Sequence, residues 1–524
     1  MVDFDLSKEV FVSLVRGSQR PAIVQLMAKV ESVCTPLQLY ATLQNAGHSY
    51  LLESVEKEKR HARYSFVGSE PEIVVSIKDR YLTIECQISS ELSQYIYRRA
   101  KSMGQMETLI GGKYRVRIEE GRDALDAFRD VFPTSNDAVL LNQKRFDRQT
   151  FLGGAIGYNS YDFVYDSWIK IDKKTDADTP DMHFAIMTKT FVFDHITDET
   201  YIVITPFVTE ESDLEAVYDH ACADARLMER SLHMSAVIGI SDNIKGKVNA
   251  EKPVADTGQE DFEKAVVRAK QYIIDGDIFQ IVLSRRYTVR MGQTPLQLYI
   301  RLRNINPSPY MYIFNFRDIG IVGASPETLM TVYERKVITN PIAGTCPRGK
   351  NEKEDRQLAA GMLRDEKERA EHIMLVDLGR NDVRMVSKSG TVRVDDLMSV
   401  IKYSHVQHIE STVSGDMRDD CDQFDTTRAI FPAGTLSGAP KIRAMEIIDE
   451  LEPESRGIYG GGVGYYSWNG DADFAIVIRT VLIKHNIAYV QAGAGIVADS
   501  DPTYEYQETE RKMAAMIKAI GGKQ

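Results

Sequence analysis

The chain lacks several features that mark whole classes of protein. Its 524 residues contain no uninterrupted apolar run of the roughly 18 to 20 residues that a membrane-spanning helix needs. The first residues, Met-Val-Asp-Phe-Asp-Leu, are acidic and have neither the basic start nor the apolar run of a signal peptide. The five cysteines are scattered, without a Cys-x-x-Cys pair or zinc-like spacing. We therefore expect a protein of the reducing cytoplasm.

Basic residues are also scarce relative to acidic ones. The sequence has 64 Lys and Arg against 76 Asp and Glu, which gives a formal charge of -12. This balance argues against broad electrostatic attraction to nucleic acid or to an anionic membrane. An anionic substrate must therefore be captured by a few local groups.

The composition is otherwise that of a folded globular protein, with 43% hydrophobic residues and no biased tract. Residues 1–240 mix helical stretches with strand-like runs such as Phe184–Phe193 and Tyr201–Val208. A segment rich in Gly, Asp, Lys and Pro at 241–258 is the best candidate for a linker. The second region, 259–524, continues the mixture. We expect an α+β fold.

The second region begins with a helical pattern that ends near Gly276, followed by a strand over Ile278–Arg286. Because side chains alternate along a strand, Phe279, Ile281 and Leu283 share one face and Gln280, Val282 and Ser284 the other. Further strands are predicted at Tyr310–Phe316, Ile319–Ala324 and Ala475–Ile483, and helices near 352–378, 440–451 and 503–520.

Two of these helices carry carboxylates on one face. Glu368 and Glu371 share a helix face with leucines, and Glu505, Glu508 and Lys512 recur along a helix that begins at Asp501-Pro502. Together the two helices can offer one or two carboxylates to Mg²⁺. Spacing alone does not bring them together, and a solvated charged helix edge is the alternative interpretation.

Glycines and one arginine form a third feature. Tyr459 is followed by Gly-Gly-Gly-Val-Gly, and Gly493-Ala-Gly495 precedes the second carboxylate helix, so backbone N–H groups can approach an anion closely. Arg479 interrupts an apolar strand over Phe474–Ile483, where a carboxylate ligand would satisfy its guanidinium. Simple tight connections and a structural Asp partner are the alternatives.

Two residues have the chemistry for proton transfer. A histidine ordinarily has a near-neutral pKa, which makes His408 a candidate, and Glu327 directly follows a predicted strand, where its carboxyl can project into a site. A packed histidine and a turn or helix-cap carboxylate are the plainer interpretations.

In combination, these segments resemble the chorismate-utilising enzymes over most of residues 259–520. The matching motifs occur in the following order: Gly276-Asp-Ile-Phe-Gln-Ile-Val-Leu-Ser-Arg285, Gly323-Ala-Ser-Pro-Glu327, Pro341-Ile-Ala-Gly-Thr345, Glu371-His-Ile-Met-Leu-Val-Asp-Leu-Gly-Arg-Asn-Asp382, Pro432-Ala-Gly-Thr-Leu-Ser-Gly-Ala-Pro-Lys441 and Glu505-Tyr-Gln-Glu508-Thr. The resemblance implies large antiparallel sheets packed as a sandwich with helices outside.

The resemblance also implies one active site with Mg²⁺ as cofactor. Glu371 and Glu508 would hold the metal, supported by Glu368 and Glu505. The substrate-binding residues would be Gly344, Thr345, Tyr459, Arg479, Gly493, Gly495 and Lys512. Glu327 resembles the family's general acid, whereas His408 and Thr435 resemble residues that flank the substrate ring.

Two positions indicate the branch of the family. Water-adding members have a lysine at the position of Gln280, and aminodeoxychorismate synthase typically has one at the position of Ala343. Neither glutamine nor alanine can supply that amine. The expected reaction is the conversion of chorismate and ammonia to anthranilate and pyruvate, with aminodeoxychorismate synthase component I as the alternative. A non-catalytic protein that binds tryptophan or chorismate is the alternative of another class.

Residues in both regions resemble a tryptophan feedback site. These are Ser54, Pro309, Tyr310, Met311, Val463, Gly464 and Tyr465, and each is an ordinary strand end or turn when taken alone. No cysteine lies in a Gly-x-Cys-x-Gly nucleophile motif, so ammonia is expected to be free or to come from a partner glutamine amidotransferase subunit, in a heterotetramer.

Overall fold

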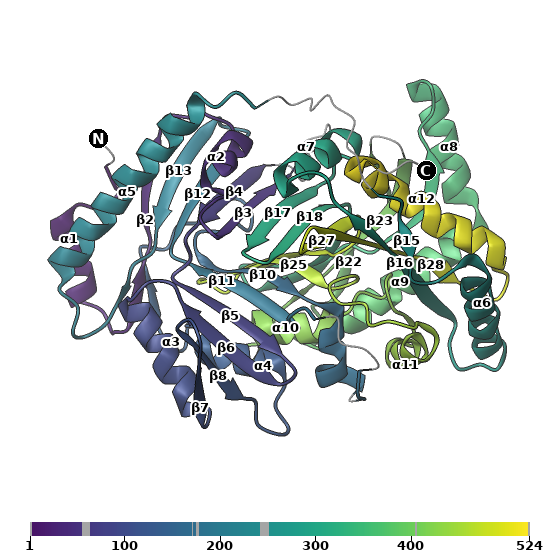
Figure 1. Cartoon of the computed structure of the whole chain (residues 1–524), viewed down its shortest axis with the longest axis horizontal. Helices are drawn as coiled ribbons and strands as arrows, with labels where there is room; N and C mark the ends of the chain where they lie inside the picture. Colours follow the sequence, from purple (N-terminus) through teal and green to yellow (C-terminus); the bar gives the residue numbers. More distant parts are fainter. Residues whose placement is uncertain are drawn as a thin grey trace.

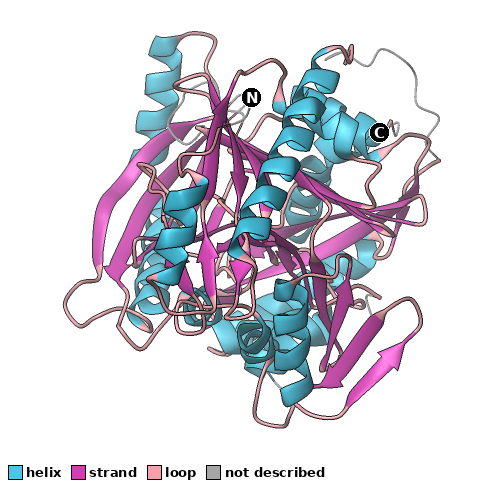
Figure 2. Ribbon diagram, turned by 90° about the vertical axis from the view of Figure 1, so that its left-hand side faces the viewer, coloured by secondary structure: helices cyan, strands magenta, loops and turns pink. Residues whose placement is uncertain are grey.

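The structure is a computed structural model that describes residues 3–54, 63–169, 171–173, 178–240, 251–403 and 406–521. Within these residues, two large antiparallel sheets lie at the centre and helices cover their outer faces (Figures 1 and 2). The helices are α1 (Lys8–Arg16), α2 (Pro36–Leu43), α3 (Glu91–Ser102), α4 (Ala124–Val131), α5 (Leu214–Ala236), α6 (Gln259–Ile274), α7 (Pro295–Ile305), α8 (Glu352–Arg364), α9 (Glu366–Arg384), α10 (Gln423–Ile430), α11 (Lys441–Leu451) and α12 (Pro502–Ile520).

The larger sheet has 13 strands among the described residues. Its order is β21 (Ile342–Pro347), β23 (Val406–Asp416), β20 (Lys336–Thr339), β19 (Thr328–Tyr333), β26 (Ala472–Ile476), β25 (Gly462–Ser467), β10 (Gly154–Asn159), β11 (Met182–Met187), β5 (Ile73–Lys78), β6 (Tyr81–Cys86), β8 (Lys113–Arg117) and β7 (Met106–Leu109), with β22 (Arg393–Lys402) paired to β23.

The second sheet has 12 strands within the same ranges. Its order is β15 (Val254–Ala255), β16 (Gln280–Arg290), β28 (Ile487–Ile496), β27 (Thr480–Lys484), β18 (Ile319–Ser325), β17 (Tyr310–Phe316), β3 (His48–Glu53), β4 (Tyr64–Ser69), β12 (Lys189–Asp194), β13 (Glu199–Ile204) and β2 (Leu26–Val30), with β24 (Gly438–Ala439) paired to β16. A small third sheet contains β14 (Phe207–Val208), β1 (Ala22–Val24) and β9 (Val139–Leu141).

Apolar side chains form the contact between the two large sheets. One buried cluster contains Tyr50 and Phe314 from the 12-stranded sheet together with Ile156, Val463 and Tyr465 from the 13-stranded sheet. Separate clusters fill the space between each sheet and its own helices. The chain therefore forms a sandwich with helices outside, as the family resemblance implied.

Three sequence predictions merged elements that the structure separates. The predicted strand Phe184–Phe193 is β11 and β12, which belong to different sheets. The predicted strand Phe474–Ile483 is likewise β26 and β27, because Arg479 has a φ of 52° and turns the chain from one sheet to the other. The predicted helix 352–378 is α8 and α9, since Asp365 is extended and caps α9 by accepting from the amides of Lys367 and Glu368.

The position of Phe279 was also predicted wrongly, because it was expected inside a strand, on the same face as Ile281 and Leu283. It precedes β16 and is 72% exposed, whereas Ile281 and Leu283 are buried against α6 and α11 as their alternation predicts. The amide of Phe279 donates to the Ala439 carbonyl, so the chain is still attached to its neighbour at this point.

Both large sheets contain strands from each of the two predicted regions, 1–240 and 259–524, and so the division remains a prediction. Residues 241–250 of the predicted linker lie outside the described residues, and its later part contains β15, which pairs with β16. None of the described helices is both long and apolar enough to cross a membrane.

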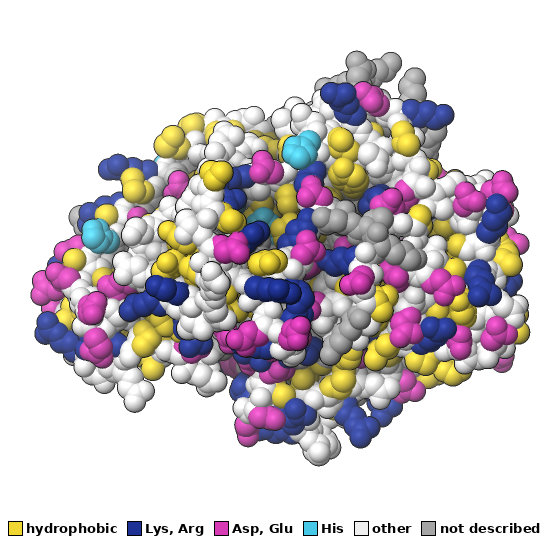
Figure 3. Space-filling view, turned by 60° about the horizontal axis from the view of Figure 1, so that its bottom comes forward, with side chains coloured by type: hydrophobic (Ala, Val, Ile, Leu, Met, Phe, Trp, Pro, Cys, Tyr) yellow, Lys and Arg dark blue, Asp and Glu magenta, His cyan; other side chains and the backbone are white. Residues whose placement is uncertain are grey.

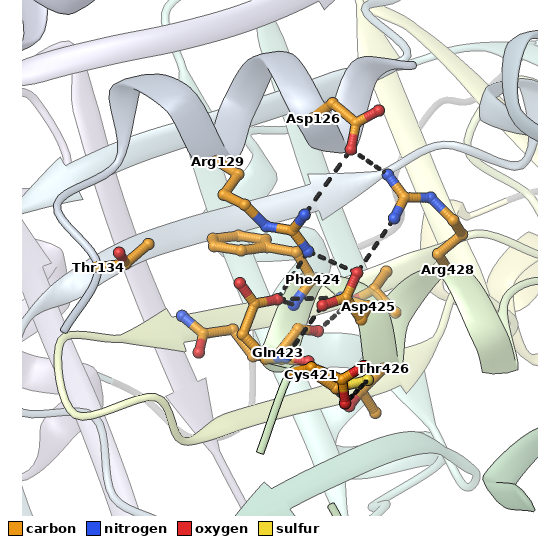
Figure 4. Close-up of polar contacts among 12 residues, drawn as sticks. Asp126, Arg129, Thr134, Cys421, Gln423, Phe424, Asp425, Thr426 and Arg428 are labelled. Atoms are coloured by element: carbon orange, nitrogen blue, oxygen red, sulfur yellow. Dashed lines mark hydrogen bonds and ion pairs between the residues drawn. The ribbon is translucent and has the colours of Figure 1, made fainter. Parts of the chain in front are cut away.

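Ion pairs also join the two regions. On the outer face of the 13-stranded sheet, Arg129 of α4 binds Asp422 and Asp425 at 2.9 and 2.7 Å, and Arg428 of α10 binds Asp123 and Asp126. The guanidinium of Arg129 also lies over the ring of Phe424 (Figure 4). These contacts fix α4 against α10.

Acidic and basic side chains are interspersed on the face drawn in Figure 3. The net charge of -12 is therefore not gathered into one acidic field on this face. Capture of an anionic ligand has to depend on local groups rather than on the overall charge.

Candidate active site

The general acid candidate, Glu327, is buried between β18 and β19. Thr435, in the segment that follows α10, donates its hydroxyl to Glu327 Oε1 at 2.8 Å. Burial is the main cause that raises the pKa of Glu327 to about 8, with the Thr435 hydrogen bond acting in the opposite direction. Glu327 is therefore protonated at neutral pH and can donate a proton.

His408 on β23 is suited to accept a proton, whereas Glu327 is suited to donate one. Its Nδ1 lies 2.8 Å from the Gly344 carbonyl and 3.1 Å from Thr345 Oγ1 on the paired strand β21. Because a carbonyl only accepts, Nδ1 carries the proton and Nε2 is left as the acceptor. Burial lowers the pKa of His408, although the bond to Gly344 opposes this effect. A neutral imidazole of this kind can accept a proton.

Four carboxylates on two helices come together in the structure, as the family resemblance implied. Glu368 and Glu371 lie on α9, and Glu505 and Glu508 lie on α12. Burial raises the pKa of Glu371, and Glu368 and Glu508 raise it further. Burial also raises the pKa of Glu368 and of Glu505, with Glu508 adding to both shifts. The four groups are thus close enough to repel one another electrostatically.

These carboxylates fit a hard divalent cation. Within the described ranges, no three His, Cys, Asp or Glu residues form a closed metal cage. Mg²⁺ needs only one or two protein carboxylates, because water and substrate oxygens complete its octahedron. Such an ion would relieve the repulsion among Glu368, Glu371, Glu505 and Glu508, which Lys512 offsets only in part.

Lys512 and Arg479 connect this cluster to the sheet. Lys512 Nζ lies 2.6 Å from Glu508 Oε1 and donates to the Gly493 carbonyl at 2.9 Å, and Arg479 donates to the Lys512 carbonyl at 2.8 Å. In the described part of the chain, no carboxylate lies within ion-pair distance of Arg479. The guanidinium therefore retains donors for an anionic ligand.

Two glycines on β28 leave room for neighbouring side chains, Gly493 for the Tyr459 hydroxyl and Gly495 for the Gln280 amide. A Cβ at Gly493 would lie 3.0 Å from the Tyr459 hydroxyl and 2.8 Å from the Leu283 carbonyl, so no larger residue fits there. A Cβ at Gly495 would approach the Gln280 amide nitrogen to 3.3 Å. Gly344 has a φ of 70° and lies against Glu368. These glycines let the backbone approach the site closely.

Gln280 lies on the face of β16 that the strand alternation predicted. It is 3% exposed, and its Oε1 has no hydrogen-bond partner among the described residues. A buried amide oxygen without a partner is costly, so this atom is available to a bound ligand.

The predicted tryptophan residues come from both large sheets: Tyr310, Val463 and Tyr465 pack in the cluster between the sheets, whereas Met311 is buried on the helix-covered side of the 12-stranded sheet. Ser54 follows β3 directly, Met311 on β17 pairs with Glu53, and Pro309 is buried immediately before β17. Tyr310 donates to Asp473 on β26 at 3.0 Å, and Asp473 pairs with Tyr465 on β25, the strand that also carries Val463 and Gly464. The hydroxyls of Ser54 and Tyr465 are buried without a partner in the described structure.

One acidic residue near the site was missed by the sequence reasoning. Glu410 is buried two residues after His408 on β23, and it contributes to the raised pKa of Glu327. Strand alternation places it on the same face as His408, a signal that could have revealed it. Tyr403, whose hydroxyl donates to the Pro326 carbonyl next to Glu327, gave no comparable signal.

Comparison with known proteins gives a consistent result. The family of chorismate binding enzymes matches residues 93–518. Anthranilate synthase component 1 of Haloferax volcanii is 45% identical, with 98% of this chain and 97% of the relative covered. The same component of Thermococcus kodakarensis is 42% identical, with 93% and 97% covered.

Solved structures agree with the sequence relatives. Anthranilate synthase component I from Streptococcus pneumoniae superposes with a TM-score of 0.70 and 35% identity, covering 87% of this chain and 92% of that chain. The menaquinone-specific isochorismate synthase of Escherichia coli, at 17% identity and a TM-score of 0.66, shares the fold, covering 97% and 98%. The chain therefore belongs to the chorismate-binding enzyme family and, within it, to the component 1 chains of anthranilate synthase.

Proposed function

We propose that this chain converts chorismate and ammonia to anthranilate and pyruvate at the site formed by Glu327, His408, Arg479 and the carboxylates of α9 and α12. The proposal rests on a pair of proton-transfer groups whose pKa values are shifted in opposite directions. Glu327, with its raised pKa, is protonated and His408, with its lowered pKa, is neutral at the same pH. Such a pair suits a reaction that needs both an acid and a base.

In the first half of the reaction, Glu327 protonates the C4 hydroxyl as it leaves, while ammonia adds at C2. Thr435 holds the Glu327 carboxyl in place through its 2.8 Å hydrogen bond. In the second half, a proton leaves C2 and the enolpyruvyl group departs as pyruvate. The free Nε2 of His408 is suited to assist this step. Aromatisation drives the second half.

Chorismate is a dianion, and two groups of residues are suited to its carboxylates. Arg479, Tyr459 and the backbone at Gly493–Gly495 would bind the enolpyruvyl carboxylate. Mg²⁺ would be held by Glu371 and Glu508, with support from Glu368 and Glu505. When bound, it would supply a positive charge for the ring carboxylate. Gly344, Thr345 and Lys512 lie at this end of the proposed site.

The proposal includes partners and regulation. Ammonia comes from a glutamine amidotransferase subunit, consistent with the component 1 relatives, in a heterotetramer that acts in the cytoplasm. The five free cysteines favour that reducing compartment. Tryptophan inhibits by binding between the two regions of the chain at Ser54, Tyr310 and Tyr465, where the hydroxyls of Ser54 and Tyr465, which have no partner within the described ranges, offer hydrogen bonds.

The test is to incubate the purified chain with chorismate, MgCl₂ and an ammonium salt and to identify the products. Anthranilate fluorescence with an equal amount of pyruvate is expected. A 4-amino product that needs a separate lyase would instead support aminodeoxychorismate synthase, a result that Ala343, which has no amine, argues against. Binding of chorismate or tryptophan without turnover would contradict an enzymatic role.

A further inference from the structure

A buried ion pair lies beside the proposed active site, in a segment for which no role was predicted. Arg456, five residues after the end of α11, contacts Glu452 through Nε at 2.9 Å and through a terminal nitrogen at 2.6 Å. The side chains are 1% and 5% exposed. Both charges are therefore removed from solvent.

The remaining contacts of this pair reach the elements that carry the proposed reaction groups. Arg456 donates to the Leu436 carbonyl at 2.7 Å, one residue after Thr435, and to the Val282 carbonyl on β16 at 2.7 Å. The guanidinium also lies 5.7 Å from the ring centre of Tyr459. Arg456 thus contacts Leu436, the residue next to Thr435, which donates to the proposed acid Glu327. It also contacts the strand that carries Gln280 and lies near Tyr459, which is proposed to bind a substrate carboxylate.

Glu452 extends the network along the sheet. Its Oε1 accepts from the Ser284 amide at 2.7 Å and from the Ser284 hydroxyl at 2.9 Å, and Gln491 donates to the same hydroxyl at 2.8 Å. Gln491 precedes Gly493 by two residues on β28. The ion pair therefore links β16 and β28 where both strands border the site.

Stability alone does not account for such a pair. Removing two charges from water costs free energy, and replacement of a buried pair by apolar groups is often neutral or stabilising. Apolar packing is also incomplete here, since Arg456 and Tyr459 both line a cavity of about 260 Å³. A guanidinium with several fixed donors can hold these carbonyls in place where packing does not.

We propose that Glu452 and Arg456 are positioning residues that fix Tyr459 and the Thr435–Leu436 segment against β16 and β28. The inference rests on the proposed function, since it concerns the same site. Loss of the pair displaces the donor to Glu327, which lowers kcat, and it displaces Tyr459, which raises the KM for chorismate. Neither residue touches the reacting atoms.

The test compares Arg456→Met, Glu452→Gln and the double variant. Each single change leaves a buried charge unpaired, so the urea midpoint of unfolding should fall. The double change removes both charges, so the midpoint should recover. We expect kcat/KM for chorismate in the double variant to stay roughly tenfold or more below wild type. Recovery of both quantities would overturn the proposal, because it would assign the pair a purely structural role.

Two further variants keep the test decisive. Arg456→Lys retains the charge but loses the forked donors to Leu436 and Val282, so a folded protein with reduced kcat/KM is expected, and wild-type kcat/KM would contradict the inference. Arg428→Met, in the α4–α10 cluster of Figure 4, is the control for a broken ion pair and should lower stability while leaving the KM unchanged. Absence of anthranilate from the wild type itself would instead reject the proposed function.

Discussion

The proposed reaction site and the proposed tryptophan site use buried polar groups in different ways. In the reaction site, Glu327 and His408 have hydrogen-bond partners and pKa values shifted in opposite directions. In the tryptophan site, the hydroxyls of Ser54 and Tyr465 have no partner among the residues that the structure describes, and the ring of Tyr465 packs against Phe66 and Phe151.

This difference indicates what each site depends on. The first depends on charge, because a proton or a cation has to be held at a defined atom. The second depends on shape and on hydrogen bonds that a ligand can complete, because its interior is mainly aromatic and aliphatic. A change of charge should therefore affect the first site, and a change of volume the second.

The largest effect is expected for Glu327→Gln. Glutamine has nearly the same volume and can still accept from Thr435, but it cannot donate the proton. General acid catalysis contributes about 10²–10⁴-fold, so kcat for anthranilate formation should fall by that factor with little change in stability. A kcat within a few-fold of wild type would show that another group is the acid.

Glu508→Gln should reduce turnover by roughly 10²–10³-fold, because it removes a full charge from the carboxylate cluster. The binding of Mn²⁺, followed by its electron paramagnetic resonance signal, should weaken in parallel. Glu366→Gln is the matched control, since Glu366 is an exposed residue in the first turn of α9. If the two variants bound Mn²⁺ equally well, the metal site would be assigned wrongly.

Ser54→Phe should weaken tryptophan inhibition by about 5–150-fold, the usual range of allosteric coupling, because the new ring fills the buried space. Turnover without tryptophan should stay nearly unchanged. By thermodynamic linkage, chorismate should also weaken tryptophan binding to the wild-type chain. Calorimetry and inhibition curves measure both effects, and unchanged inhibition of Ser54→Phe would reject the regulatory site.

The smallest effect is expected for Gln280→Lys. A lysine here could activate water at C2, so a minor part of the chorismate should become the water adduct, isochorismate, when ammonia is omitted. Chromatography of the products tests this expectation. A folded variant that binds chorismate but forms no adduct would show that Gln280 does not face C2.

Local patterns predicted the elements that have clear boundaries. β17 has the predicted bounds Tyr310–Phe316, and α12 begins at Pro502 after the cap Asp501, because the capping residue and the proline define that start. An apolar run does not reveal a residue with a left-handed backbone conformation. Arg479 was therefore predicted inside one strand, whereas it lies between strands of two different sheets.

The sequence patterns also could not predict which residues far apart in the chain come together in the folded protein. Spacing placed Glu368 and Glu371 on one helix and Glu505 and Glu508 on another, but only the packing of α9 and α12 brings the four together. The family resemblance supplied the expectation that they meet. The roles of Glu452 and Arg456 depend on contacts between segments far apart in the chain, which periodicity does not reveal.

The pH dependence of kcat/KM for chorismate, measured at a constant concentration of free ammonia, tests the central claim most directly, because kcat/KM reports the pKa values of the free enzyme. Glu327 has to be protonated, and its pKa is raised to about 8, so kcat/KM should fall as the pH rises through about 8. His408 has to be neutral, and its pKa is lowered, so kcat/KM should fall again only below pH 6.5. The alkaline decline should vanish in Glu327→Gln. A kcat/KM that keeps rising above pH 8 in the wild type, or an alkaline decline that persists in Glu327→Gln, would contradict the account.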